Sequence, residues 1–388
     1  MSRQRIGRRD AIGRMIELSV KKNYNQSMSD SNSMNVSVIG AGSTYGVYLV
    51  KWALTLKYFP ETNNELPVPS IGTISYSNTS ERNRNLVLEV LENDLSQMPS
   101  FSNKKFDDIA KDVRGYTNWR EMIQKEKPGM VVICSPLETH APYLRELLND
   151  FKVKNILCEP PITHLNEADS VDSLVHLAEE KGVTVGVNQQ YAILYQKLQG
   201  LPMNPQESDS GKFGDLLTGL TGLHITFVTH GSRVWRKMQG VGEREILEDL
   251  GPHVYELIPK SLRDQKVTVR DVKKEGDDVF LNYVEYDILF GTVPVKLTLG
   301  YHRKLKSLKL VFKKGKKDFE FNISGASNPQ TGEFTRWIEG KNYAYYFKHL
   351  LNTDLVKTSF IHSLAGKPEV TLQEGINSLK FIRSLYTR

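Results

Sequence analysis

The pattern of apolar and polar positions has two textures, which meet near residue 190. In the first, short runs that are apolar throughout alternate with segments in which apolar residues recur at the spacing of a helix. The apolar runs are 36–39, 71–76, 130–134, 155–158 and 183–187, and the segments with helical spacing are 47–56, 81–91, 140–148 and 166–181. Strands that are apolar on both faces and separated by helices predict a parallel sheet covered on both sides.

Beyond about Tyr191, the predicted strands alternate between apolar and polar residues. They are 223–228, 266–273, 278–290, 293–301, 307–313 and 317–323, and helical patterns occupy 244–260, 339–352 and 372–385. Short turns such as 290–292 join consecutive strands, which is typical of an antiparallel or mixed sheet with one covered face. The sequence therefore predicts an α/β domain with a parallel sheet, followed by an α+β domain with an open, mostly antiparallel sheet.

The first residues of the chain differ in composition from the rest. Five arginines crowd the first turns, and the stretch 23–35 is polar, with little that could build a core. We expect 1–34 to be a basic, disordered extension. Nucleic-acid binding is disfavoured because no aromatic residue is interleaved before Tyr24. A mitochondrial presequence is a third interpretation, which Asp10 and Glu17 weaken.

Length and composition set the remaining bounds. With 388 residues, 39% apolar and 25% charged, the chain can form about two cores, which we place at 35–190 and 191–388. No apolar run approaches the roughly 20 residues that span a bilayer, and no signal peptide opens the chain, so we expect a cytoplasmic protein without membrane partners. Cys134 and Cys158 sit inside apolar runs, which favours core residues in a reducing compartment, and we predict no metal site.

A glycine-rich turn lies between the first predicted strand and the first predicted helix. Its sequence is Gly40-Ala41-Gly42-Ser43-Thr44-Tyr45-Gly46. Gly40 permits a tight turn, and Gly42 lets a pyrophosphate approach the backbone at the helix N-terminus. Ser43 and Thr44 either donate hydroxyls to phosphate or cap the helix. Because this turn opens the α/β alternation, we predict a dinucleotide-binding Rossmann domain, with Tyr45 standing where the standard fingerprint has its third glycine.

The residues after the second strand bear on which cofactor binds. An acidic side chain there would hydrogen-bond the ribose of NAD, but the sequence has Ser77-Asn78-Thr79-Ser80-Glu81-Arg82. Small hydroxyl and amide groups with Arg82 and Arg84 nearby suit a 2′-phosphate, so Ser77, Asn78 and Arg82 are candidate contacts and NADP is favoured. NAD is the alternative, because a polar turn with a helix cap is compatible with it.

Four phrases, in order along the chain, resemble the Gfo/Idh/MocA family (glucose–fructose oxidoreductase, inositol dehydrogenase and MocA). They are V-V-I-C-S-P-L-E-T-H at 131–140, I-L-C-E-P-P-I-T at 156–163, E-D-L-G-P-H at 248–253 and A-G-K-P-E-V-T at 365–371. The first is similar to the family's strand ending in T-P-N-x-x-H, the second to its V-L-C-E-K-P-L-A, and the third to its D-x-G-x-H. The last is similar to its closing segment, so the resemblance extends from about residue 35 to 388.

This resemblance implies an NAD(P)-dependent oxidoreductase with a Rossmann domain and a C-terminal domain whose open sheet forms a homodimer or homotetramer interface. The implied reaction transfers hydride at a carbon that bears oxygen or nitrogen, on a small polar metabolite such as a sugar derivative. The resemblance also places residues at the ends of two strands beside the cofactor. These are Ser135, Pro136, His140, Glu159 and Pro160.

The family surrounds the reacting hydroxyl with the lysine of E-K-P and the aspartate and histidine of D-x-G-x-H. Asp249 and His253 carry over, four residues apart on one face of a predicted helix, where they can share a proton relay. Alternatively, Asp249 caps the helix and His253 packs beneath the sheet. The lysine does not carry over, because its position is Pro160, which has no ionisable group. Tyr191 is a candidate for the missing role, and so is His230.

The loop after the first long strand of the second domain carries cationic groups and an aromatic wall. These residues are Arg233, Trp235, Arg236 and Lys237. In the resembled family this loop lies near the substrate, and such groups suit a carboxylate or phosphate; a basic loop at a subunit edge is the alternative. Without the lysine, we favour reduction of a carbonyl or imine, where a single acid suffices. The second hypothesis is a non-catalytic NAD(P)-binding sensor or regulator.

Overall fold

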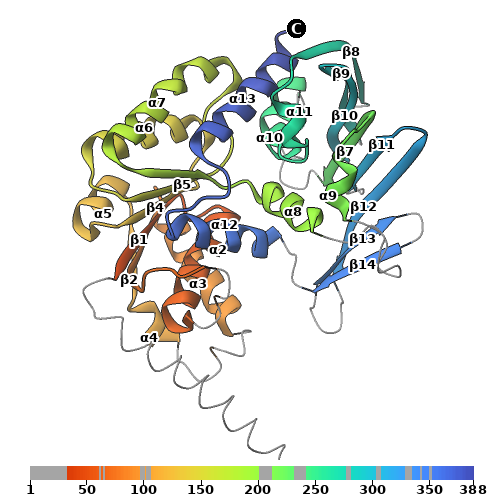
Figure 1. Ribbon diagram of the computed structural model, residues 1–388. Helices are drawn as coiled ribbons and strands as arrows, with labels where there is room; N and C mark the ends of the chain where they lie inside the picture. Colours follow the sequence, from red (N-terminus) through yellow and green to blue (C-terminus); the bar gives the residue numbers. More distant parts are fainter. Residues whose placement is uncertain are drawn as a thin grey trace, which may run out of the picture.

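A computed structural model shows two sheets joined by helices (Figure 1). The residues that it describes are 33–60, 63, 66–96, 101, 106–200, 212–230, 242–276, 281–302, 307–327, 334–340, 343–348 and 352–388. Both predicted classes of sheet are present, in the predicted order along the chain.

The first sheet has six strands in the order β3-β2-β1-β4-β5-β6, and every neighbouring pair is parallel. The strands are β1 (Met34–Ile39), β2 (Ile71–Ser77), β3 (Val113–Tyr116), β4 (Met130–Ile133), β5 (Asn155–Cys158) and β6 (Thr184–Val187). The order reverses at β1, between β2 and β4. In such sheets, ligands bind at the carboxyl ends of the strands beside this switch point.

Helices cover both faces of this sheet, as the pattern predicted. They are α2 (Thr44–Tyr58), α3 (Glu81–Ser96), α4 (Phe106–Ala110), α5 (Trp119–Glu126), α6 (His140–Asp150) and α7 (Asp172–Lys181), with 3₁₀ turns at η4 (Leu137–Thr139) and η5 (Leu165–Val171). Helix α8 (Gln190–Gln199) follows β6 and packs instead on helices from later in the chain. The expected helix over 166–181 thus begins as η5. The strand β3 was not predicted, because it is only four residues long and two of them are exposed. The eight-residue helix α5 was not predicted either.

The second sheet has eight strands in the order β14-β13-β12-β11-β7-β10-β9-β8. They are β7 (Gly222–His230), β8 (Val267–Gly276), β9 (Leu281–Phe290), β10 (Val293–His302), β11 (Ser307–Lys314), β12 (Lys317–Ser327), β13 (Phe334–Gly340) and β14 (Tyr343–Lys348). Only the β7–β10 pair is parallel among these strands. The sheet is therefore mostly antiparallel, as predicted.

The helix expected over 339–352 is wrong. The structure has the end of β13 and the whole of β14 there, paired antiparallel from Thr335 with Lys348 to Gly340 with Tyr343. The segment Tyr343-Ala344-Tyr345-Tyr346-Phe347 is rich in aromatic residues, which suit a strand. Pairing with β13 satisfies the backbone hydrogen-bonding groups of this segment. Such pairing between strands cannot be read from the local spacing of apolar residues, which suggested a helix.

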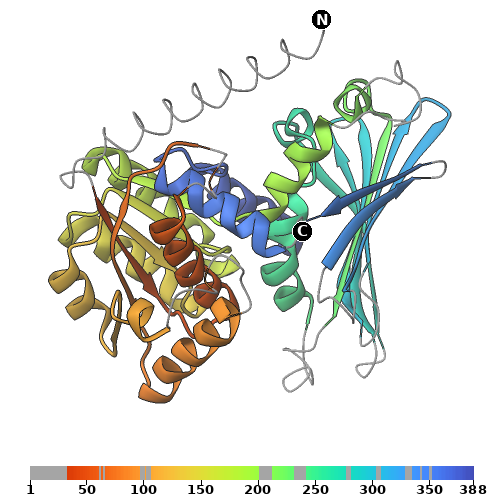
Figure 2. The same cartoon turned by 90° about the horizontal axis from the view of Figure 1, so that it is seen from below.

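Helices from the second part of the chain fill the space between the two sheets. These are α9 (Phe213–Leu216), α10 (Glu243–Tyr255), α11 (Lys260–Arg263), α12 (Asn352–Leu364) and α13 (Leu372–Tyr386). Figure 2 shows the blue C-terminal helices lying against the first half. Val356, Phe360 and Ile361 of α12 belong to the same buried cluster as the first strands of the Rossmann sheet. None of the described helices is both long and apolar enough to cross a bilayer.

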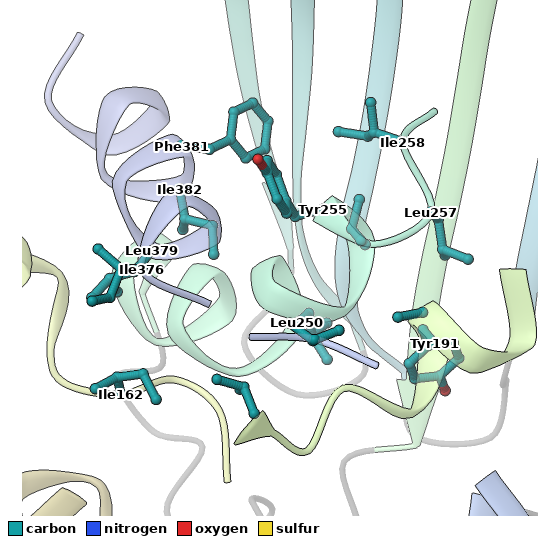
Figure 3. Close-up of a cluster of buried hydrophobic side chains, with 14 of the residues drawn as sticks. Ile162, Tyr191, Leu250, Tyr255, Leu257, Ile258, Ile376, Leu379, Phe381 and Ile382 are labelled. Carbon is teal, nitrogen blue, oxygen red and sulfur yellow. The ribbon is translucent and has the colours of Figure 1, made fainter. Parts of the chain in front are cut away.

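Helices α10 and α13 pack closely, and this contact fixes where α10 stands (Figure 3). A Cβ on Gly251 would lie 2.9 Å from Cγ1 of Ile382, so the glycine of E-D-L-G-P-H is needed for this approach. The rings of Tyr255 and Phe381 add a contact with 5.2 Å between centroids. The last helix thereby holds α10 in place against the strands of the second sheet.

Candidate cofactor and reaction site

The glycine turn packs directly on the end of β4. Gly40 has φ +81°, and a Cβ there would lie 2.7 Å from the carbonyl oxygen of Cys134, so only glycine fits. Gly46 supplies the second close approach, because a Cβ there would lie 2.6 Å from Cα of Ala41. The turn is therefore one residue longer than the standard fingerprint. Tyr45 reaches across to α8, where its hydroxyl lies 3.4 Å from Nε2 of Gln190.

Ser43 caps helix α2. Its Oγ accepts a hydrogen bond of 2.9 Å from the backbone N–H of Gly46. The side chain of Thr44 lies outside the described residues. The capping interpretation thus holds for Ser43, at the helix end where a phosphate would meet free backbone N–H groups.

Asn78 lies over the glycine turn at the end of β2. A Cβ on Gly42 would come within 2.7 Å of Nδ2 of Asn78, and that buried nitrogen has no hydrogen-bond partner in the described part of the chain. Ser77 is buried, and its carbonyl accepts from the N–H of Gly40 at 3.0 Å. Arg82 is exposed on the first turn of α3. An unpaired amide donor beside a glycine cradle fits a polar ligand.

A cavity of about 520 Å³ opens over this turn, and we call it the glycine-turn cavity. Its lining residues are Ile39, Gly40, Gly42, Ser43, Ser77, Asn78, Thr79, Asn83, Thr117, Trp119, Cys134, Ser135, Pro136, Thr139 and Tyr143. No Asp, Glu, His, Lys or Arg is among these described lining residues. The cavity is uncharged and is built largely from backbone and small polar side chains.

His140 ties together the loops that follow β4 and β5. Its Nε2 lies 2.7 Å from the carbonyl oxygen of Ser135, and its Nδ1 lies 2.8 Å from that of Pro161. Burial lowers the pKa of this imidazole. The peptide bond between Pro160 and Pro161 is cis. His140 therefore positions two loops that carry predicted cofactor contacts.

Glu159, which the sequence resemblance placed beside the cofactor, is held by neutral groups. Its Oε1 accepts from Nδ2 of Asn188 at 2.6 Å and from the thiol of Cys134 at 3.8 Å. Burial raises the pKa of this carboxyl group to about 7, and the two hydrogen bonds oppose that rise. Asn188 was not predicted as a site residue; it is one of three polar residues, 188–190, at the carboxyl end of β6.

Asp249 and His253 both lie on α10, but each has its own partner. The exposed carboxylate of Asp249 accepts a hydrogen bond from the buried hydroxyl of Tyr301. Nδ1 of His253 lies 3.3 Å from Oε1 of Gln189, and its ring centroid is 5.0 Å from that of Tyr191. Burial lowers the pKa of His253 to about 4, against an opposing effect of Asp249. No hydrogen bond joins the two side chains in the described structure.

A second cavity of about 380 Å³ lies between α10 and the ends of β4 and β5, and we call it the acidic cavity. Its lining residues are Ser43, Tyr45, Cys134, Ser135, Leu137, His140, Glu159, Pro160, Pro161, Glu245, Glu248 and Asp249. Four of these described residues are carboxylic acids and none is Lys or Arg. Tyr191 and His253 are not among them, and both lie in the layer behind, packed on Phe227.

The two cavities share Ser43, Cys134 and Ser135. An extended ligand can therefore run from the glycine turn into the acidic cavity. The predicted substrate residues Arg233, Trp235, Arg236 and Lys237 lie outside the described residues, as does the side chain of His230. Within the described residues, no cluster of His, Cys, Asp and Glu could hold a metal ion.

Comparison with known proteins agrees with this geometry. Residues 74–189 match a family model described as an oxidoreductase family with an NAD-binding Rossmann fold. No curated protein matches the sequence closely enough to count as a relative.

Solved structures share the fold over nearly the whole chain. A myo-inositol 2-dehydrogenase from Lactobacillus plantarum is 14% identical, with a TM-score of 0.58, over 92% of this chain and 96% of that one. A 3-ketoreductase from Actinomadura kijaniata, in complex with NADP and TDP-benzene, is 12% identical, with a TM-score of 0.54, over 92% and 98%. An oxidoreductase from Agrobacterium radiobacter, in complex with NAD⁺, L-tartaric acid and magnesium, is 13% identical, with a TM-score of 0.59, over 92% and 96%. At these identities the likeness shows the fold.

Proposed function

We propose that this chain is an oxidoreductase of the Gfo/Idh/MocA family, whose model matches residues 74–189, and that it uses NADPH to reduce a carbonyl or imine carbon of a small polyhydroxylated metabolite. The observation that carries the proposal is the continuity of the two cavities through Ser43, Cys134 and Ser135. An uncharged cavity for the body of a dinucleotide thereby leads to a cavity lined by proton-bearing groups.

The residues of the glycine-turn cavity fit a dinucleotide. Gly40 and Gly42 leave the space that a Cβ would fill, and the N-terminus of α2 offers backbone N–H groups to a pyrophosphate. The unpaired Nδ2 of Asn78 offers a further donor. A bound nicotinamide dinucleotide supplies the hydride-carrying carbon. The walls of its pocket would be Ser135, Pro136, His140, Glu159 and Pro160, as the resemblance implies.

We propose NADP over NAD because no carboxylate lines the rim where the adenosine ribose would lie. Asn78 and Asn83 line that rim, and Arg82, exposed on the same turn of α3 as Asn83, stands next to it in sequence. An amide pair with a nearby guanidinium suits a 2′-phosphate better than a ribose diol. Both cofactors occur among the solved structures of this fold.

The acidic cavity favours a reacting end that is uncharged or carries an amine. Its described lining has four carboxylic acids and no Lys or Arg, so a carboxylate at the reacting carbon would meet like charge. Hydroxyl groups, in contrast, donate hydrogen bonds to carboxylates. The printed names of two structural neighbours, an inositol dehydrogenase and a ketoreductase, accord with such a substrate. A phosphate farther from the reacting carbon is compatible with the predicted basic loop over 233–237.

By resemblance, proton transfer falls to His253, with Asp249 orienting it and Tyr191 beside it. His253 lies on α10 in contact with Tyr191, and Asp249 lines the acidic cavity. Both assignments are proposals. Burial lowers the pKa of His253 to about 4, which leaves little imidazolium to donate a proton at neutral pH.

A second function is favoured by Pro160. It stands where the family has its lysine and lines the acidic cavity without an ionisable group. A non-catalytic NAD(P)-binding sensor would tolerate this change. The two functions differ in one outcome, because a sensor binds NADPH without oxidising it in the presence of any substrate.

We also propose a homodimer or homotetramer formed through the open sheet. One face is covered by α10, which contacts β7, β9 and β10. The other carries ion pairs such as Lys296 with Glu285, at 2.7 Å, and Lys309 with Glu320, at 2.8 Å. Light scattering of the full chain tests this, and a monomer across micromolar concentrations would reject it.

The test of the main proposal is a fluorescence titration with NADPH and NADH, followed by a panel of keto-sugars, keto-polyols and sugar imines. We expect saturable NADPH binding, weaker NADH binding, and NADPH oxidation with at least one member of the panel. Absence of binding to both cofactors would reject the proposal. Binding without oxidation across the panel would favour the sensor.

A further inference from the structure

Among the described residues, only one of the four carboxylic acids of the acidic cavity, Glu248, forms an ion pair with a Lys or Arg side chain. Glu245 accepts from the backbone N–H of Gly242 at 2.9 Å and thereby caps α10. Glu248 accepts from the N–H of Leu165 at 3.0 Å and from Nε of Arg244 at 3.1 Å. These two carboxylates hold the backbone and the loop after β5 in place.

Asp249 accepts from Tyr301, and Glu159 from Asn188 and Cys134. Both contacts of Glu159 use Oε1, and Oε2 receives no hydrogen bond among the described residues. No Lys or Arg in the described part of the chain forms an ion pair with Glu159. A partly buried carboxyl group held by neutral donors alone retains its proton more readily than a salt-bridged one.

Ionisable groups face Glu159 from several elements. Cys134 and Cys158 flank it at the ends of β4 and β5, and burial raises the pKa of both thiols, so they are neutral near pH 7. His140 on α6 lines the same cavity, and burial lowers its pKa. From α10 come the carboxyl groups of Glu245, Glu248 and Asp249. No Lys or Arg is among the described residues that line the cavity, so no such cation there favours ionisation of Glu159.

We propose that Glu159 is the proton-transfer group of this site, immediately before the position where the family's lysine is replaced by Pro160, and that Asn188 is its positioning residue. This inference rests on the proposed function. Glu159 lines the cavity into which the reacting carbon must come, and the amide of Asn188 fixes one oxygen while the other is left for the substrate.

The balanced step is a two-electron reduction. The carbonyl carbon accepts a hydride, with its electron pair, from the reduced nicotinamide, and a C–H bond forms. The C=O π bond breaks, and its electron pair takes a proton from the carboxyl of Glu159, which gives an alcohol and a carboxylate. A proton from bulk solvent then restores the carboxyl group, so that the net step consumes the carbonyl compound, one NADPH and one proton and yields the alcohol and NADP⁺. Both forms of Glu159 are populated near neutrality, because burial raises its pKa to about 7.

The test that does not require turnover is an infrared titration of the full chain without cofactor. We expect a carbonyl band of a protonated carboxyl group that disappears with a midpoint near pH 7 and is absent from Glu159→Gln. The matched control is Glu245→Gln, which removes a carboxyl group from the same cavity and should keep the band. Asn188→Ala should move the midpoint upward by about one pH unit, because a hydrogen bond to the carboxylate is lost. A band that persists in Glu159→Gln would overturn the proposal.

A parallel activity measurement separates this inference from the proposed function. With a substrate found in the panel, Glu159→Gln should lower kcat at least about 100-fold while NADPH binding is retained. If His253→Ala instead abolishes the pH dependence of kcat and Glu159→Gln does not, Glu159 is excluded as the proton-transfer group. If NADPH fails to bind the wild-type chain while the infrared band titrates, the proposed function fails and the proton site stands.

Discussion

The two cavities of this protein adjoin each other and differ in almost every property. The glycine-turn cavity is lined by glycines, hydroxyls and amides without a charged side chain, whereas the acidic cavity is lined by four carboxylic acids. The first uses backbone geometry that only glycine permits at Gly40. The second uses side chains whose ionisation depends on burial, as at Glu159. In this account, cofactor binding thus depends on backbone shape, and proton transfer depends on the ionisation of buried side chains.

The difference teaches which part of such a site tolerates change. A phosphate-binding turn fails when a Cβ enters it, because backbone cannot move aside. A proton-transfer site tolerates loss of one group if a neighbour has a suitable pKa, and this chain has Pro160 beside Glu159. The following variants separate the two cavities, in order of decreasing effect.

Gly40→Ala should destabilise the protein by about 3 kcal/mol. Positive φ costs a residue with a Cβ about 1–2 kcal/mol, and the clash with the carbonyl of Cys134 at 2.7 Å adds a similar amount. Urea unfolding measures this. The matched control is Gly182→Ala, at φ +64° with no atom within 4 Å of the new Cβ, which should cost only about 1 kcal/mol. Equal losses in the two variants would show that the turn does not pack on β4 as described.

Gly42→Val should weaken NADPH binding about 100-fold, which corresponds to about 2.7 kcal/mol. Its Cβ would meet the side-chain amide of Asn78 rather than backbone, so the fold should survive while the space for the phosphate is filled. Calorimetric titration gives the affinity, and the melting temperature reports the fold. Unchanged affinity in a folded variant would place the dinucleotide elsewhere.

Glu159→Gln should make stability less dependent on pH. Between the ordinary glutamate pKa of 4.5 and about 7, the folded protein binds more protons than the unfolded chain, so its free energy of unfolding falls as the pH rises. The glutamine variant lacks this loss. Relative to wild type, it should gain about 2 kcal/mol between pH 5 and pH 8, measured by urea unfolding at both values. A difference that does not change with pH would mean that Glu159 ionises normally.

Arg82→Ala should have the smallest effect. We expect NADPH affinity to fall about fivefold, or about 1 kcal/mol, and NADH affinity to stay constant, because the guanidinium would meet only the 2′-phosphate. Titrations of both cofactors at low and physiological salt measure the ratio. A matched loss for both cofactors would remove Arg82 from the specificity argument.

The sequence was sufficient for the parts of the molecule that depend on local rules. The two classes of sheet and the glycine turn follow from apolar periodicity, and short phrases with fixed spacing pointed to the family whose model matches residues 74–189. The sequence did not show, however, that Gly46 is the glycine at which α2 packs tightly on the backbone of Ala41, because that contact exists only in the folded chain. The division of the chain into domains at residues 190 and 191 stays a prediction. Helix α12 follows that boundary in the sequence, yet its buried side chains belong to the core of the first part.

The parts that sequence reasoning missed depend on contacts between distant segments. Glu159 and Asn188 are brought together only because β5 and β6 are neighbours in the sheet. The partner of Asp249, Tyr301, comes from β10 and could not be paired with it by spacing. For His253, the spacing from Asp249 suggested a relay, whereas the contact with Gln189 and the burial that sets its pKa are tertiary.

The central claim is that the two cavities have separate tasks: the glycine-turn cavity binds the dinucleotide, whereas Glu159 in the acidic cavity serves the proton step and is not needed for cofactor binding. The most direct test is calorimetric titration of NADPH into wild type, Gly42→Val and Glu159→Gln at pH 7. The account predicts that Glu159→Gln, which keeps the shape of the side chain, binds NADPH within about twofold of wild type, while Gly42→Val binds about 100-fold more weakly. Equal loss of affinity in both variants would contradict the separation of the two cavities.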